Sequence, residues 1–149
     1  MKRLHLHVSV PEIEPAIAFY STMFNAAPVV VKDDYAKWML DDPFVNLAIS
    51  SRARANGVDH VGIQVDSAEE LGELATRLKA AGETTFDQEA TTCCYAKSDK
   101  SWVTDPAGVR WETFFTHGDA TAYGEDVIPD NSGATACCAP AAAPKQACC

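Results

Sequence analysis

The chain has 149 residues, with 12 basic and 21 acidic side chains and a formal net charge of −9 at pH 7. This length fits one domain with its own core, and the acidic balance opposes binding to a nucleic-acid backbone. The N-terminal residues lack the apolar segment of a signal peptide, because His5, His7 and Ser9 interrupt it. No apolar run approaches membrane-spanning length. We therefore expect a cytoplasmic protein with no nucleic-acid or membrane partner.

The first half of the chain predicts a strand, a helix and three further strands. Residues 4–10 are rich in β-forming side chains, and Pro11 and Pro15 lie at the start of the helix. Apolar residues then recur at helical spacing until the helix ends near Asn25. The further strands are predicted at residues 28–32, 35–40 and 44–50, before a polar linker that ends at Gly57.

The second half repeats this order. Ser67 and Glu70 form a capping box, which predicts a helix that ends at Gly82. A Trp-containing strand, a turn and a last strand then resemble the end of the first half. The strands of this half are predicted at residues 59–65, 101–104 and 109–115.

The repeat predicts the architecture. Two βαβββ modules, residues 1–52 and 58–119, are expected to pair into one α+β domain around a shared site. The second module is longer by a polar segment that contains Cys93 and Cys94, and this segment predicts a loop because it has no apolar periodicity. Beyond the second module, the Ala-, Pro- and Cys-rich residues 120–149 predict a disordered tail.

The repeat also selects candidate metal ligands. His5 and His60 occupy equivalent positions in the first strands of the two modules, so their side chains are expected to face one cavity. In the last strand, Glu112 lies on the face of Arg110 and Phe114. Two imidazoles and one carboxylate form the facial triad that holds non-haem Fe(II) and leaves coordination positions open.

Simpler interpretations of these residues stay open. We interpret His7 as a structural, partly buried histidine, because it has no counterpart in the second module. Glu112 would face water if its strand were half exposed. For Cys93 and Cys94, the simpler interpretation is that they are small buried hydrophobic side chains or incidental surface thiols.

The six cysteines occur as three adjacent pairs: Cys93–Cys94, Cys137–Cys138 and Cys148–Cys149. Adjacent cysteines form only a strained disulfide, so the pairs indicate thiol chemistry rather than cross-linking. Two neighbouring thiolates chelate a soft, thiophilic centre. Lys97 and Lys100 are expected to lower the pKa of the Cys93 and Cys94 thiols.

With these residues in view, residues 1–119 resemble the vicinal oxygen chelate (glyoxalase/bleomycin resistance/extradiol dioxygenase) superfamily, whose members pair βαβββ modules around a metal. The block TTCCYAKSDKSWVTDPAGVRWETF, residues 91–114, and the HGD that follows are similar to the organoarsenical C–As lyases and the cadmium-induced proteins grouped with them. The resemblance implies an Fe(II)-dependent dioxygenase that uses O₂ to cleave the carbon–arsenic bond of trivalent organoarsenicals.

The resemblance also implies roles for single residues. The implied iron ligands are His5, His60 and Glu112, and the implied arsenic ligands are Cys93 and Cys94. Tyr95 and Lys100 are further candidates for the pocket. Superfamily members often pair, which makes a homodimer an expectation. The tail cysteines either capture and hand over arsenite or are dispensable.

Two other classes of function stay open. Another metal enzyme of the superfamily, such as a glyoxalase, an extradiol dioxygenase or a thiol transferase acting on an antibiotic, leaves Cys93 and Cys94 unexplained. A glyoxalase also needs a fourth ligand near Asn46, whose amide is a poor metal ligand. A non-catalytic protein that sequesters cadmium or arsenite would use the cysteines without iron or O₂.

Overall fold

Two βαβββ modules make up the part of the chain that the computed structural model describes, residues 1–52 and 55–124. The first module contains β1 (Arg3–Ser9), α1 (Ile13–Phe24), β2 (Val30–Lys32), β3 (Tyr35–Asp41) and β4 (Phe44–Ser50). The second contains β5 (Gly57–Val65), α2 (Ala68–Ala80), β6 (Phe86–Cys93), β7 (Ala96–Thr104) and β8 (Arg110–Asp119). The tail cysteines, at positions 137, 138, 148 and 149, lie outside the described residues.

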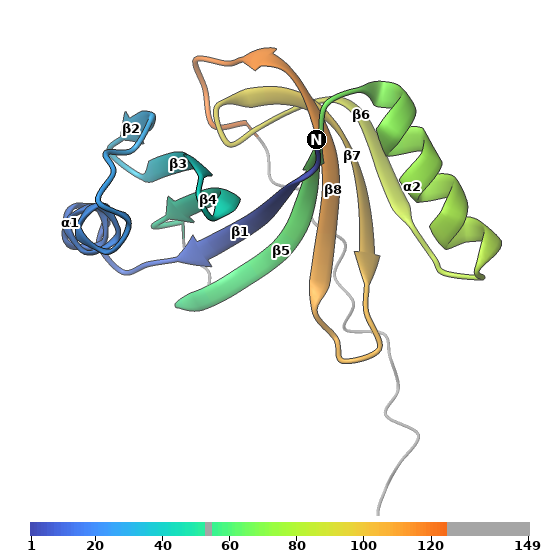
Figure 1. Ribbon diagram of the computed structural model, residues 1–149, viewed down its shortest axis with the longest axis horizontal. Helices are drawn as coiled ribbons and strands as arrows, with labels where there is room; N and C mark the ends of the chain where they lie inside the picture. The colour runs from blue at the N-terminus through green and yellow to red at the C-terminus, as the bar shows by residue number, and fades with distance from the viewer. Residues whose placement is uncertain (53–54, 125–149) are drawn as a thin grey trace, which may run out of the picture.

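The strands form one curled sheet in the order β2-β3-β4-β1-β5-β8-β7-β6 (Figure 1). The modules meet where β1 pairs antiparallel with β5. On either side of this seam the pairing is parallel, β1 with β4 and β5 with β8. The predicted α+β fold of two paired modules is therefore confirmed, and the first strand of each module lies at the centre of the sheet.

The two helices lie on the outer sides of the curled sheet (Figure 1). Ser67 begins α2 as predicted, because its hydroxyl accepts a hydrogen bond from the Glu70 amide over 3.2 Å. Asn25 ends α1 in the left-handed conformation, with φ of 49°. Within the described residues, neither helix has the length and apolar character needed to cross a membrane.

Side-chain alternation along β1 separates an apolar outer face from a polar inner face. Leu6 and Val8 pack against the apolar cluster beneath α1. His5, His7 and Ser9 point the other way and are buried on the concave face. The inner face of the sheet therefore offers buried polar side chains, which an apolar core would exclude.

The prediction of a loop around Cys93 and Cys94 is wrong. The residues on both sides belong to long paired strands, β6 and β7, with Thr92 opposite Lys97 and Cys93 opposite Ala96. Cys94 and Tyr95 form a two-residue turn with φ of 57° and 60°, as in a type I′ hairpin. Such turns usually carry Asn-Gly, so this hairpin has no sequence signal.

Candidate metal centre and thiol pair

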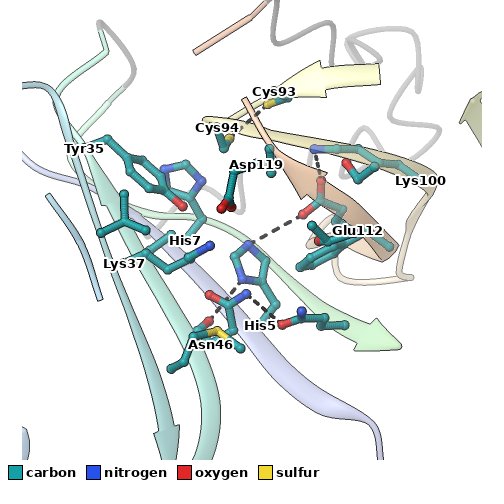
Figure 2. Close-up of a pocket in the computed structure, with 18 of the residues that line it drawn as sticks. His5, His7, Tyr35, Lys37, Asn46, Cys93, Cys94, Lys100, Glu112 and Asp119 are labelled. Carbon is teal, nitrogen blue, oxygen red and sulfur yellow. Dashed lines mark hydrogen bonds and ion pairs between the residues drawn. The ribbon is translucent and has the colours of Figure 1, made fainter. Parts of the chain in front are cut away.

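Three adjacent strands bring the predicted ligands together on the concave face. His5 lies opposite Gly62 in the β1–β5 pair, and Gly62 lies opposite Glu112 in the β5–β8 pair. The Nε2 atoms of His5 and His60 are 3.2 Å apart. Glu112 Oε2 lies 3.6 Å from His5 Nε2 and 3.4 Å from His60 Nε2. Two imidazole nitrogens and one carboxylate oxygen thus converge, all three side chains being buried (Figure 2 shows His5 and Glu112).

The other nitrogen of each imidazole is held by a hydrogen bond. His5 Nδ1 lies 3.1 Å from the Asn46 carbonyl oxygen, an acceptor that β4 places opposite His5. His60 Nδ1 lies 2.8 Å from the Asp59 carboxylate, which also accepts from Arg110. Because an acceptor faces Nδ1 in both rings, Nδ1 carries a proton, and Nε2 is the nitrogen that each histidine would offer to a cation, His60 after the loss of its second proton.

The charges of the three groups differ sharply. Burial lowers the pKa of His5 to about 4, so this ring is neutral near pH 7. Burial also acts to lower the pKa of His60, but hydrogen bonds to Asp59 and Glu112 outweigh it and raise the pKa to about 9. Burial acts to raise the pKa of Glu112, yet the positive charge of Lys100 and the bond to His60 hold it well below its usual range.

His7 lies beside His5 and His60, the two histidines at equivalent positions of the repeat. Its ligand atom belongs to a group with those of His5 and His60, all within 4.8 Å of one another. However, His7 Nε2 lies 2.8 Å from the Ser50 hydroxyl, and burial lowers the pKa of His7 to about 3. The contact with Ser50 gives His7 a structural role. Its closeness to the other two rings also makes His5, His7 and His60 an alternative set of three metal ligands.

The turn between β6 and β7 places the two sulfur atoms side by side. Neighbouring residues in a strand point to opposite faces, whereas the positive φ of Cys94 leaves its Sγ 2.9 Å from that of Cys93. Cys93 is 3 % exposed. A hydrogen bond with Cys93 lowers the pKa of the Cys94 thiol against the effect of burial, and the charge of Lys100 lowers it further.

Lys100 connects the thiol pair to the candidate metal centre. Its ammonium group is buried and lies 2.5 Å from Glu112 Oε1, which leaves Oε2 facing the histidines. Burial opposes the charged form, but Glu112 and the two cysteines raise the pKa of Lys100. Lys97 differs from the prediction, because strand alternation turns its side chain to the exposed face of β7.

Tyr95 joins the hairpin to the first module. Its hydroxyl donates to Asp34 over 2.7 Å, in the short turn between β2 and β3, and Arg52 binds the same carboxylate. Its ring packs against Tyr35, with centroids 5.7 Å apart. These contacts tie the turn that carries Cys94 to the opposite edge of the curled sheet.

One cavity of about 250 Å³ lies between the thiol pair and the candidate metal centre (Figure 2). Apolar side chains also border it, among them Val30, Met39, Ala48 and Phe114. Its polar lining includes His5, Glu112, Lys100, Cys93, Cys94 and Tyr35. The cavity can therefore take a small molecule that touches both sulfur atoms and the histidine–carboxylate cluster.

Several residues of this site were not predicted. Asp59 orients His60 and directly precedes it, so an acidic neighbour of a candidate ligand was the signal that could have found it. Tyr35 lies against the thiol pair from the far end of the sheet, and no local pattern marks it. Tyr123 lies after the last strand, in a stretch whose composition predicts a tail.

Comparisons with known proteins identify the relatives of this chain. The model of the Glyoxalase/Bleomycin resistance protein/Dioxygenase superfamily matches residues 2–113. A protein of Bacillus sp. (strain MD1) named trivalent organoarsenical cleaving enzyme is 45% identical over 119 residues, which cover 78% of this chain and 74% of that protein. The cadmium-induced protein CadI of Mycobacterium tuberculosis (strain ATCC 25618 / H37Rv) is 38% identical over 125 residues, 83% of this chain and 82% of CadI.

Solved structures support the fold. An extradiol ring-cleaving dioxygenase from B. fuscum superposes with a TM-score of 0.60 at 15% identity, covering 79% of this chain and 33% of that enzyme. The predicted resemblance to this superfamily is therefore confirmed. The relatives include both an organoarsenical cleaving enzyme and a cadmium-induced protein, as the sequence indicated. The chain belongs to the Glyoxalase/Bleomycin resistance protein/Dioxygenase superfamily.

Proposed function

We propose that this chain is an Fe(II)-dependent dioxygenase that cleaves the C–As bond of trivalent organoarsenicals. One observation carries the proposal: a single cavity is lined by two adjacent thiols and by members of a histidine–carboxylate cluster. The thiols suit a thiophilic metalloid, and the nitrogen and oxygen donors suit a harder divalent cation. The name of the relative from Bacillus sp. (strain MD1) supports an organoarsenical as the small-molecule substrate.

The proposed iron ligands are His5, His60 and Glu112. Their donor atoms lie within 3.6 Å of one another, so one divalent cation would satisfy all three. This set is favoured over the three-histidine set, because the Nε2 of His7 is engaged with Ser50. When bound, Fe(II) would supply the activation of O₂ that such two-histidine, one-carboxylate sites provide.

The proposed arsenic ligands are Cys93 and Cys94. In methylarsonous acid, arsenic carries one methyl group and two hydroxyl groups; each Cys sulfur replaces one hydroxyl, and the thiol proton leaves with that hydroxyl as water. Lys100 favours the thiolate forms, because its positive charge interacts with both sulfur atoms. When the two sulfur atoms occupy two of the three arsenic valences, the remaining As–C bond is held inside the cavity. The reaction at the proposed metal site then no longer depends on a random encounter with the organoarsenical, because the substrate is already positioned.

The atoms of this reaction balance without a further reductant. Methylarsonous acid and one O₂ contain the atoms of one arsenous acid and one formaldehyde. The C–As bond breaks, carbon gives up four electrons to O₂, and arsenic stays trivalent while it gains an oxygen.

The proposal includes a cytoplasmic location, where thiols stay reduced. A homodimer remains a prediction.

A second function, sequestration of cadmium or arsenite without catalysis, is favoured by the thiol pair and by the likeness to CadI. Two variants separate the two functions. Replacing Cys93 and Cys94 with Ser should abolish arsenite release and leave the iron content intact. His60→Ala should abolish iron binding and arsenite release while the protein still binds phenylarsine oxide. If His60→Ala turns over at the wild-type rate, the dioxygenase proposal is wrong.

A further inference from the structure

Residues 120–124, here called the strap, follow β8 and pack on the hairpin that carries the thiol pair. Gly124 forms an antiparallel bridge with Cys93. Its φ is +81°, and an added Cβ would lie 1.8 Å from the Thr92 carbonyl oxygen, so only glycine fits here. The strap therefore rests directly on the end of β6, next to the two sulfur atoms.

The strap brings Tyr123 into contact with Cys94. Tyr123 is 5 % exposed, and its hydroxyl oxygen lies 3.5 Å from Cys94 Sγ. The Tyr123 ring packs edge-on against the rings of Tyr35 and Tyr95, with centroids 6.1 and 5.6 Å apart. The guanidinium of Arg52 lies 3.6 Å from the ring centroid. The ring is thus held by aromatic and cationic neighbours while its hydroxyl meets the sulfur.

We propose that Tyr123 is a positioning residue, which fixes Cys94 Sγ beside Cys93 Sγ so that both sulfurs bind one trivalent arsenic. This inference rests on the proposed function for the nature of the ligand. As a neutral thiol, Cys94 donates to the Tyr123 hydroxyl oxygen. When the sulfur is a thiolate or binds arsenic, the hydroxyl donates to the sulfur instead.

Two physical effects follow from this contact. A sulfur that already has its binding orientation loses little rotamer freedom when arsenic binds, so the complex should dissociate slowly. The contact also acts on the thiol itself. After the hydrogen bond with Cys93 and the charge of Lys100, the hydrogen bond with Tyr123 further lowers the pKa of Cys94.

The test uses the full-length, metal-free protein without O₂, so that no turnover occurs. The four tail cysteines are replaced with Ser in every sample, which leaves Cys93 and Cys94 as the only thiols. The probe is phenylarsine oxide, and a dithiol chase measures its dissociation. Tyr123→Phe should weaken binding by about 3- to 10-fold, chiefly through faster dissociation. Tyr20→Phe is the matched control on α1, where the ring packs on Phe24, and it should bind as the wild type does.

Probe binding by Gly124→Ala and the pH dependence of Cys94 alkylation give two further tests. Gly124→Ala, which displaces the strap, should weaken binding at least as much as Tyr123→Phe. The pH profile of Cys94 alkylation should move to higher pH in Tyr123→Phe, an effect that loss of packing alone would not produce. Wild-type affinity, dissociation rate and alkylation profile in a folded Tyr123→Phe protein would overturn the inference.

Phenylarsine oxide binding and arsenite release are measured separately, so failure of the inference can be distinguished from failure of the proposed function. If the wild type binds phenylarsine oxide and Tyr123→Phe binds it weakly, the inference holds even where the iron-loaded protein releases no arsenite. If the iron-loaded protein cleaves its substrate while Tyr123→Phe binds the probe as the wild type does, only the inference fails. Absence of binding by the wild type would overturn both.

Discussion

Gly62 and Glu112 face each other across the β5–β8 pair so closely that a Cβ on Gly62 would lie 2.1 Å from the Glu112 carbonyl oxygen. Gly62→Ala must therefore push β8 away and displace a proposed iron ligand. We expect a loss of about 1–3 kcal/mol in the free energy of unfolding and weaker iron binding. Denaturant unfolding and metal titration measure the two effects.

Gly72→Ala is the matched control for that variant. Gly72 lies in α2, and an added Cβ there meets nothing within 4 Å. Alanine should stabilise the helix by about 1 kcal/mol and leave iron binding unchanged. Wild-type iron affinity in Gly62→Ala would contradict the proposed ligand geometry.

Lys100→Met should destabilise the protein and weaken arsenical binding together. It removes the cation that lies 2.5 Å from the buried Glu112 carboxylate, and breaking a buried pair costs about 3–5 kcal/mol. It also removes the positive charge that favours the thiolates. Lys97→Met, on the exposed face of the same strand, should change the free energy of unfolding by at most about 0.5 kcal/mol. Equal effects of the two variants on unfolding and on phenylarsine oxide binding would refute this account.

The alkylation rate of Cys94 should depend on pH in a way that reports its environment. Because its hydrogen bond with Cys93 lowers the pKa, the reactive thiolate forms at lower pH than in an ordinary thiol, whose pKa is about 8.5. The rate should therefore reach half its maximum at a lower pH than the alkylation of the same cysteine in the unfolded protein. Cys93→Ala removes the hydrogen bond and should move the midpoint upward. Site-resolved mass spectrometry of iodoacetamide adducts gives both midpoints, and a midpoint that stays in place would be inconsistent with the proposed role of Cys93.

The repeat was the most informative feature of the sequence. It predicted two paired modules, and the pairing of β1 with β5 places His5 and His60 on one face with their Nε2 atoms 3.2 Å apart. Strand alternation predicted that Glu112 and Phe114 share a face, and both line the cavity. These residues lie in regular strands, where side-chain direction follows from position alone.

The parts that escaped prediction depend on contacts between distant segments. The turn at Cys94 and Tyr95 lacks glycine, and the tie from Tyr95 to Asp34 joins residues of different modules. Lys97 and Lys100 look alike in the sequence, yet only the pairing of β7 shows which one is buried. Tyr123 belongs to a polar, Ala-rich stretch whose composition predicts no packing, and its burial depends on the thiol hairpin beneath it.

The most direct test of the central claim supplies the Fe(II)-loaded protein with methylarsenite under air and under argon, and measures arsenite and formaldehyde. We expect one arsenite and one formaldehyde for each O₂ consumed under air, and neither product under argon. Arsenite formed equally in both atmospheres, or in neither, would contradict an O₂-dependent cleavage of the C–As bond.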